Sequence, residues 1–265
     1  MHDFVTETVD GPLPAIGLPA ALQAGTVLDG RYRIERLLGH GGSAMVYAAR
    51  DLKLNQDVAL KMLRADRLTQ TAVKRLRREV ATARTVSDPR LVRMFDIIES
   101  DQGTYLTMEL FDAPTLGMWM SGRRLAIEEV VQIASEILSA LGALHAAQII
   151  HRDLKPTNVL IDDGGRVKLG DFGLALHLQS GESRLTQTAS LVGTFEYLSP
   201  EQALGRNVDA RSDLYSLGVL LFEMLTGELP FETESSVAAA VAHVNRQAPN
   251  VRKLRRDTPR WLARV

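Results

Sequence analysis

The stretch HRDLKPTN, residues 151–158, and the tripeptide DFG, residues 171–173, decide what kind of protein this chain is. The first stretch directly follows the pair Ile149 and Ile150, and so dense a run of polar groups is unusual in a loop that meets no ligand. Asn158 and Asp171 lie thirteen residues apart and can both face one hard cation, since Mg²⁺ prefers oxygen ligands. The two segments therefore predict a polar site with a divalent cation.

Upstream lies a glycine-rich loop, GHGGSA at residues 39–44, between two stretches with strand-like alternation. Glycines let the backbone approach a bulky polyanion and turn its N–H groups toward it. A Rossmann loop would run into a helix, and a P-loop would contain Gly-Lys-Ser or Gly-Lys-Thr; neither pattern is present here. Taken alone, the loop fits a plain hairpin turn equally well.

Lys61 ends the strand-like segment VALK, residues 58–61. A lysine among apolar residues on a strand needs an anionic partner, or its ammonium group extends to water along its own methylene chain. The segment by itself leaves both interpretations open.

The pattern around these motifs changes from strands to helices along the chain. Alternation predicts strands at 31–38, 45–49, 55–63, 91–99 and 104–110, with one amphipathic helix at 71–86. Past Pro114, apolar residues recur at three and four over 127–147, and segment 213–226 is apolar nearly all round, which is typical of a buried helix. A sheet followed by helices predicts an α+β protein in two lobes. We assign residues 1–27 to a flexible leader, 28–111 to the first lobe and 112–265 to the second.

Composition limits the classes of function. Lys and Arg number 31 against 32 Asp and Glu, a net charge of −1 that gives no reason to expect nucleic acid as a partner. The chain has no cysteine, so disulfides and thiol chemistry are excluded, and a reducing compartment such as the cytoplasm is expected. No apolar run reaches the roughly 18–20 residues of a membrane helix, so we expect no membrane segment in this chain; an anchor beyond Val265 stays open.

The motifs, in this order and spacing, resemble the protein kinase family over residues 28–265. GTFEYLSPEQ (193–202) and DARSDLYSLG (209–218) are most similar to the eukaryotic-like, Hanks-type Ser/Thr kinases of bacteria. Lys155 after HRDL and Thr194 before SPE follow the Ser/Thr pattern rather than the Tyr pattern. The resemblance implies a two-lobed kinase fold and transfer of the γ-phosphate of ATP to Ser or Thr hydroxyls of protein substrates.

For phosphoryl transfer, the resemblance assigns three residues. Asp153 accepts the proton of the substrate hydroxyl and orients it, Lys155 steadies the migrating phosphoryl group, and Asp213 caps, from the buried helix, the backbone of residues 151–158, the catalytic loop. Positioning and electrostatics carry most of this catalysis, because the metaphosphate-like transition state needs little base strength.

For ATP and Mg²⁺ (or Mn²⁺), the resemblance assigns four more. Lys61 holds the α- and β-phosphates, Glu79 on the first helix tethers Lys61, and Asn158 and Asp171 bind the metal ions. For Glu79 the alternative is a surface partner one helical turn away.

The adenine pocket is expected between Leu38, Val46, Ala59 and Leu160. Ordinary core packing is the alternative for each of these apolar residues. The resemblance further implicates Met108 at the back of the pocket, the backbone of Glu109 and Phe111 in hinge hydrogen bonds, and the loop residues Gly39, His40, Gly41, Gly42, Ser43, Ala44 and Met45.

Regulation is expected at Thr186 and Thr188, between DFG and SPE. A phosphate there adds about −1.5 to −2 charges and could pair with Arg152, which orders the loop. Ser190 is a weaker candidate, and a plain solvated loop is the alternative. Autophosphorylation in trans would use a homodimer.

Two departures from the family pattern are mild. Ala44 replaces the third glycine of the loop, and Ser199 replaces the alanine of Ala-Pro-Glu. No catalytic position is substituted. The alternatives are a non-catalytic nucleotide-binding or scaffold module, that is, a pseudokinase that is inert as a truncated fragment, and a small-molecule phosphotransferase, which would not be expected to carry SPE and a Thr-rich segment.

We expect the second lobe to be incomplete at its C-terminus. Thr258 and Pro259 predict a helix start, with Trp261, Leu262 and Val265 as its apolar face. Helices this short are marginal in water.

The family resemblance also calls for an arginine paired with Glu201 of SPE. No arginine of this chain occupies the expected place, so we expect Glu201 to be a buried carboxylate without a partner, at a cost of about 3–5 kcal/mol.

Overall fold

The computed structural model describes residues 21–41, 44–64, 69–172 and 195–264. The predictions made for residues 1–20, Gly42, Ser43, Thr186 and Thr188 lie outside these ranges.

The first lobe is a six-stranded antiparallel sheet with strand order β1-β2-β3-β4-β6-β5. Alternation in the sequence forms it: Tyr32 and Ile34 are buried while Arg33 and Glu35 are exposed. Five strands lie close to the predicted ones, at Tyr32–His40 (β2), Ala44–Asp51 (β3), Gln56–Leu63 (β4), Met94–Ser100 (β5) and Gly103–Glu109 (β6), and the short strand Val27–Leu28 (β1) is additional to them.

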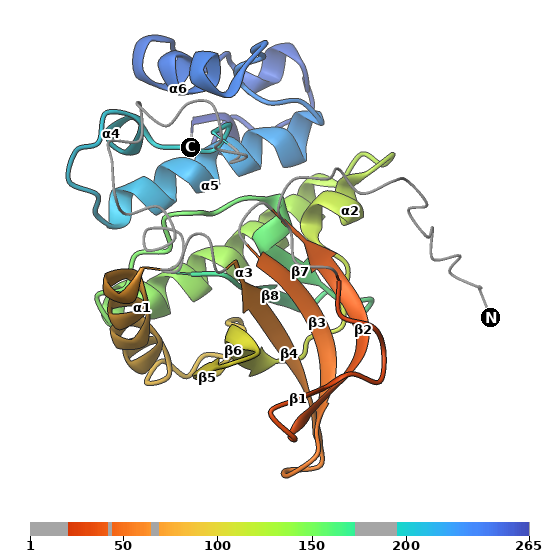
Figure 1. Ribbon diagram of the computed structural model, residues 1–265. Helices are drawn as coiled ribbons and strands as arrows, with labels where there is room; N and C mark the ends of the chain where they lie inside the picture. The colour runs from red at the N-terminus through yellow and green to blue at the C-terminus, as the bar shows by residue number, and fades with distance from the viewer. Residues whose placement is uncertain (1–20, 42–43, 65–68, 173–194, 265) are drawn as a thin grey trace.

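Helix α1, Gln70–Ala83, lies beside this sheet and contacts β5 (Figure 1). Thr69 caps its N-terminus by accepting a hydrogen bond from Ala72 N–H. Its buried residues, Ala72, Leu76, Val80 and Ala83, recur at three and four and form the face that packs inward. The predicted helix is thus present, ending three residues earlier than expected.

The second lobe is mostly helical, and Figure 1 shows α5 and α6 at the end of the molecule away from the sheet. Its elements are α2 (Leu116–Met120), α3 (Ile127–Ala146), the short hairpin β7 (Val159–Ile161) and β8 (Val167–Leu169), α4 (Pro200–Ala203), α5 (Ala210–Thr226) and α6 (Ser236–Asn245). Helix α5 is buried along most of its length, as predicted, and ends at Gly227, whose φ of 80° is easy only for glycine. None of the described helices is long and apolar enough to cross a membrane.

One hydrophobic core joins the two lobes. Met94 and Met108 of the sheet belong to the same buried cluster as Leu141 of α3, Leu154 of the catalytic loop and Phe172. Packing across this core, rather than a linker, therefore holds the sheet of the first lobe in position relative to the catalytic loop.

A second cluster lies within the first lobe, around Ile34, Tyr47 and Tyr105. Leu22 packs against it and donates its N–H to the Tyr47 hydroxyl at 3.1 Å. The leader predicted at 1–27 thus reaches into the lobe at its end, because Leu22 gains buried apolar contacts and Val27 pairs with Arg33 in the sheet.

The predicted helix start at Thr258 is wrong for the described residues. Thr258 is buried and its hydroxyl has no hydrogen-bond partner, so it does not cap a helix. Only a 3₁₀ turn forms, at Leu262–Arg264. Leu262 is buried as expected, but Trp261 is 60% exposed, because the turn is too short to place both on one packed face.

Candidate active site

The catalytic loop is anchored from below by Asp213, which is 1% exposed on α5. Its carboxylate accepts hydrogen bonds from His151 N–H at 2.9 Å and Arg152 N–H at 2.8 Å, and contacts His145 Nε2 at 2.7 Å. A buried carboxylate surrounded by donors holds the backbone rigidly. The prediction that Asp213 caps this loop is confirmed.

His151 ties the catalytic loop to the segment that carries Asp171. It is fully buried, its Nε2 lies 2.9 Å from the Gly170 carbonyl, and its Nδ1 accepts from Asp153 N–H at 3.2 Å. A carbonyl only accepts, so Nε2 carries the proton. Burial lowers the pKa of His151, which favours this neutral form. The sequence expectations give His151 no role, although its place at the start of HRDLKPTN is a signal for one.

Asp153 is held by its neighbours in the loop. Its Oδ2 accepts from Lys155 Nζ at 2.9 Å and from Asn158 Nδ2 at 3.1 Å, and Asn158 Nδ2 also reaches the Asp153 carbonyl at 2.7 Å. The Asp153 side chain keeps 32% of its surface exposed. A fixed, partly accessible carboxylate next to an ammonium group can orient a hydroxyl and take its proton.

Lys61 and Asp171 meet across the two lobes. Lys61 Nζ lies 2.7 Å from Asp171 Oδ1. Burial opposes ionisation of Asp171, but the Lys61 ammonium outweighs it and holds the pKa of Asp171 below its usual range. Asp171 (φ 57°), like Arg152 (φ 67°), has a left-handed backbone, which costs a non-glycine residue about 1–3 kcal/mol and is typical of functional sites.

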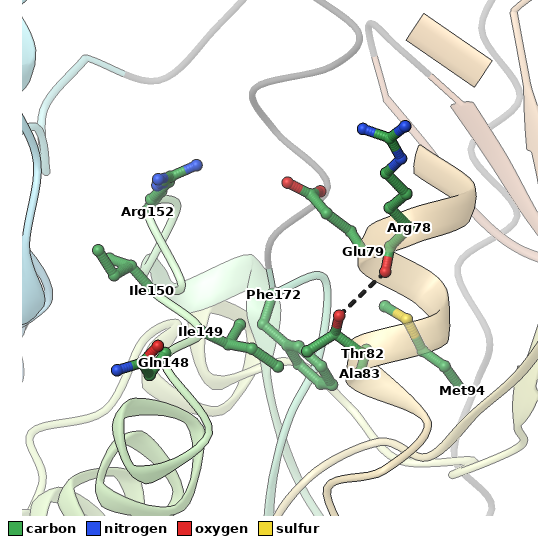
Figure 2. A pocket seen from close by; sticks show the side chains of 10 residues that line it. All are labelled: Arg78, Glu79, Thr82, Ala83, Met94, Gln148, Ile149, Ile150, Arg152 and Phe172. Atoms are coloured by element: carbon green, nitrogen blue, oxygen red, sulfur yellow. Dashed lines mark hydrogen bonds between the residues drawn. The ribbon is translucent and has the colours of Figure 1, made fainter. Parts of the chain in front are cut away.

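Glu79 does not meet Lys61 in this structure, contrary to the expectation. It lines a cavity of about 200 Å³ between α1 and the catalytic loop. Figure 2 shows Arg78 and Glu79 on α1 across from Arg152, with Ile149 and Phe172 between them. Lys61 pairs with Asp171 instead, at 2.7 Å.

The expected adenine walls do come together. Strand register places Val46 opposite Lys61 and Ala59 opposite Met108. Leu38, Val46 and Leu160 are partly buried and pack against the cluster that contains Ala59 and Met108. The partial exposure of three of them fits a pocket wall better than an ordinary core.

Side chains of neighbouring residues in the glycine loop lie on opposite faces of the sheet, because side chains alternate along a strand. Gly39 lies opposite Val46, and exposed His40 opposite Met45. Met45 packs into the second cluster, beneath Tyr47, and so its side chain lies on the face of the sheet away from Val46. If Met45 contacts nucleotide, as the resemblance implies, it would do so through its backbone. Ala44 is buried in the main core.

The hinge, the segment from Glu109 at the end of β6 to Phe111, is held by contacts that the sequence did not reveal. Glu109 N–H donates to the Arg93 carbonyl at 2.8 Å, and the Glu109 carboxylate pairs with Lys168 Nζ at 2.8 Å. Lys168 and Arg166 also lie over the Phe111 ring, at 5.7 and 5.8 Å from its centroid. With its N–H engaged, Glu109 can offer a nucleotide its carbonyl.

Glu201 has a partner, contrary to the expectation of an orphaned carboxylate. The Ser212 hydroxyl donates a hydrogen bond to it, and the residue is only partly buried. Burial opposes ionisation, yet this hydrogen bond helps to hold the pKa of Glu201 below its usual range. Nearby, Gln202 Nε2 donates to the Arg152 carbonyl at 2.8 Å, which joins α4 to the catalytic loop.

The donor set suits a metal ion carried by phosphate better than one held by protein alone. In the described ranges, no group of three or more His, Cys, Asp or Glu is arranged so that it could hold a metal ion. Asn158 and Asp171 offer an amide oxygen and a carboxylate beside Lys61, a phosphate-binding type of residue. Mg²⁺ is commonly bound by one or two such groups together with substrate phosphates, so these residues fit it.

Comparison with known proteins agrees with this geometry. A family model described as "Protein kinase domain" matches residues 32–262. The chain is 40% identical over 243 residues to the Serine/threonine-protein kinase PrkC of Bacillus subtilis, covering 91% of this chain and 37% of that protein. It is 43% identical over 223 residues to the Serine/threonine-protein kinase PknB of Mycolicibacterium smegmatis, covering 82% and 36%.

Solved structures match as well. The kinase domain of Mycobacterium tuberculosis PknI superposes with a TM-score of 0.69 at 26% identity, covering 89% of this chain and 86% of that one. The chain spans well under half the length of the curated relatives it matches.

Proposed function

The chain belongs to the protein kinase family, and from that premise we propose that it transfers the γ-phosphate of ATP to Ser and Thr hydroxyls of proteins. The observation that supports this most strongly is the catalytic loop, in which Asp153 is oriented by Lys155 and Asn158 on a backbone held by Asp213. A scaffold without activity would have no need to keep this arrangement. It therefore favours a working enzyme over a pseudokinase.

In the proposed reaction Asp153 orients the acceptor hydroxyl and takes its proton. Lys155, 2.9 Å from Asp153, stands where its ammonium group can stabilise negative charge on the phosphoryl group in transit. Asn158 would also bind a cation. Its Nδ2 is engaged by Asp153, which leaves its Oδ1 to face the metal ion.

Mg²⁺ or Mn²⁺ would be held by Asn158 and Asp171. When bound, the metal neutralises charge on the phosphate oxygens. Lys61 would exchange its contact with Asp171 for the phosphates of ATP, and Glu79 would then hold Lys61 in place once α1 has moved toward the sheet. The adenine ring would lie between Val46, Ala59 and Leu160, with its polar edge at the hinge.

Control by autophosphorylation at Thr186 and Thr188 is part of the proposal, with Arg152 as the receiving cation. Arg152 supports this because its Nε is buried without a hydrogen-bond partner among the described residues. Protein substrates, a homodimer for phosphorylation in trans and a cytoplasmic location, where ATP is supplied, complete the proposal.

The test is an assay with radiolabelled ATP and Mg²⁺, with and without a generic protein substrate, followed by mass spectrometry. We expect phosphate on Ser and Thr of the substrate and on Thr186 or Thr188 of the chain itself. Transfer only to a small molecule, or none at all, would contradict the proposal. A Thr186→Ala/Thr188→Ala variant that keeps full activity would contradict the control by phosphorylation alone.

A further inference from the structure

His243 forms a buried link between α6 and the segment that precedes α4. It is 4% exposed, its Nε2 lies 2.8 Å from the Glu196 carbonyl, and its Nδ1 lies 2.9 Å from the Tyr215 hydroxyl. The rings of Phe231 and Tyr215 stand edge-on to the imidazole, at 5.0 and 5.6 Å between centroids. Both polar atoms of the ring are thus satisfied inside an aromatic cage.

The two hydrogen bonds leave one protonation state. The Glu196 carbonyl can only accept, so Nε2 must carry the proton, and Nδ1 must then accept from the Tyr215 hydroxyl. Burial lowers the pKa of His243 and raises the pKa of Tyr215 to about 12, so both are neutral near pH 7. The link is therefore a defined chain of donors, from Tyr215 through His243 to Glu196.

The segment that receives this link is held at several further points. Ser216 Oγ donates to the Tyr197 carbonyl at 2.7 Å, and the Tyr197 hydroxyl donates to Glu223 at 2.6 Å. Ser199 then caps α4 in a reciprocal pair with Gln202. A buried oxygen of the Glu196 carboxylate has no hydrogen-bond partner among the described residues, so this side chain adds nothing visible to the hold on the segment.

From this segment the path runs to the catalytic loop. Gln202 Nε2 donates to the carbonyl of Arg152, the residue before Asp153. None of these bonds reaches the strands that carry Lys61 or the expected adenine walls. A displacement of residues 195–198 should therefore disturb the binding of a protein substrate that approaches Asp153 from the helical lobe. It should leave the binding of the nucleotide unchanged.

We propose that His243 is a positioning residue for the protein substrate, which holds residues 195–198 in place by its Nε2–H bond to the Glu196 carbonyl. This rests on the proposed kinase function. It assigns α6 the role of fixing the substrate side, although His243 itself does not touch the reacting atoms.

The test compares three variants of the full chain, with myelin basic protein as the substrate. His243→Leu removes both hydrogen bonds and should raise KM for that protein about tenfold while KM for ATP stays within about twofold. His243→Gln can still donate to Glu196 and should restore KM to within about threefold. Tyr215→Phe is the matched control, because it keeps the rings and the Glu196 bond and should change KM by less than about twofold.

Binding of myelin basic protein without ATP separates this inference from the proposed function. Loss of affinity in His243→Leu supports the positioning role even if the wild-type chain proves inactive, and an inactive wild type would contradict the kinase proposal alone. An unchanged affinity in His243→Leu would overturn the positioning role. So would equal losses for ATP and for protein together with a lower melting temperature, which indicate a merely structural residue.

A nitrogen NMR spectrum of labelled histidine checks the protonation state. We expect His243 of the wild-type chain to carry its proton on Nε2 at pH 7. A proton on Nδ1 would overturn the proposed link, and this measurement decides the matter if His243→Leu does not fold.

Discussion

The catalytic loop and helix α1 differ in how their charged residues are paired. Asp153 in the loop and Asp213, which anchors the loop from α5, are each surrounded by donors at hydrogen-bonding distance. On α1, Glu79 faces a cavity instead of Lys61, and Lys61 is paired with Asp171. In the proposed function, the half of the site that would receive the hydroxyl is therefore organised in this structure, while the half that would hold the phosphates has to rearrange.

The largest expected effect comes from breaking the organised half at its centre. Asp153→Asn should lower kcat about a thousandfold, because the amide cannot take the hydroxyl proton, while the Kd for ATP stays within about twofold. Stopped-flow nucleotide binding and steady-state turnover measure the two quantities. Asp163→Asn, at an exposed turn of the same lobe, is the matched control and should be silent. Near-wild-type turnover in Asp153→Asn would remove Asp153 from the reaction.

The next effect concerns the anchor of the loop. Asp213→Asn places an amide donor against the N–H groups of His151 and Arg152, so we expect the free energy of unfolding to fall by about 3 kcal/mol. Urea titration measures it. Asp209→Asn on the same helix is the control, since asparagine caps a helix as well as aspartate does. Equal stability of the two variants would show that Asp213 does not hold the loop.

The rearranging half should respond in activity. Glu79→Gln removes the charge that, in the proposed function, holds Lys61 once nucleotide is bound. It should lower kcat/KM about 10- to 100-fold, since Lys61 loses its tether when nucleotide binds. Glu128→Gln, at an exposed position on α3, serves as the control. Full activity of Glu79→Gln would mean that α1 need not move.

The smallest effect is a dependence of the free energy of unfolding on pH. Burial lowers the pKa of both His151 and His243, so each binds a proton more readily when unfolded. The stability that their neutral forms contribute is complete above the unfolded pKa of about 6.5 and is lost as pH falls from there toward the folded pKa.

Urea titrations between pH 7.5 and 5.5 test this dependence. We expect a slope near 1.4 kcal/mol per pH unit for each histidine that titrates, which flattens below the folded pKa. His243→Gln should remove one of the two contributions. A slope that is the same in this variant and in the wild type would contradict a buried neutral His243.

Local patterns predicted the elements well. Alternation located the strands of the first lobe to within a few residues, and the apolar run at 213–226 located α5 and its end at Gly227. Both signals depend on neighbours along the chain, which is why they survive without tertiary information. The helix expected at Thr258 does not form, because a capping signal is also local and cannot supply the packing that a short helix needs.

Residue types and their spacing along the chain were enough to predict the family, the order of the two lobes and the set of residues that could do the chemistry. The folded chain was needed to learn that Lys61 pairs with Asp171, that Ser212 donates to Glu201, and that His243 reaches Glu196. These are choices among several chemically suitable partners far apart in sequence. Burial, distance and competition between charges settle them, and none of the three is present in a linear pattern.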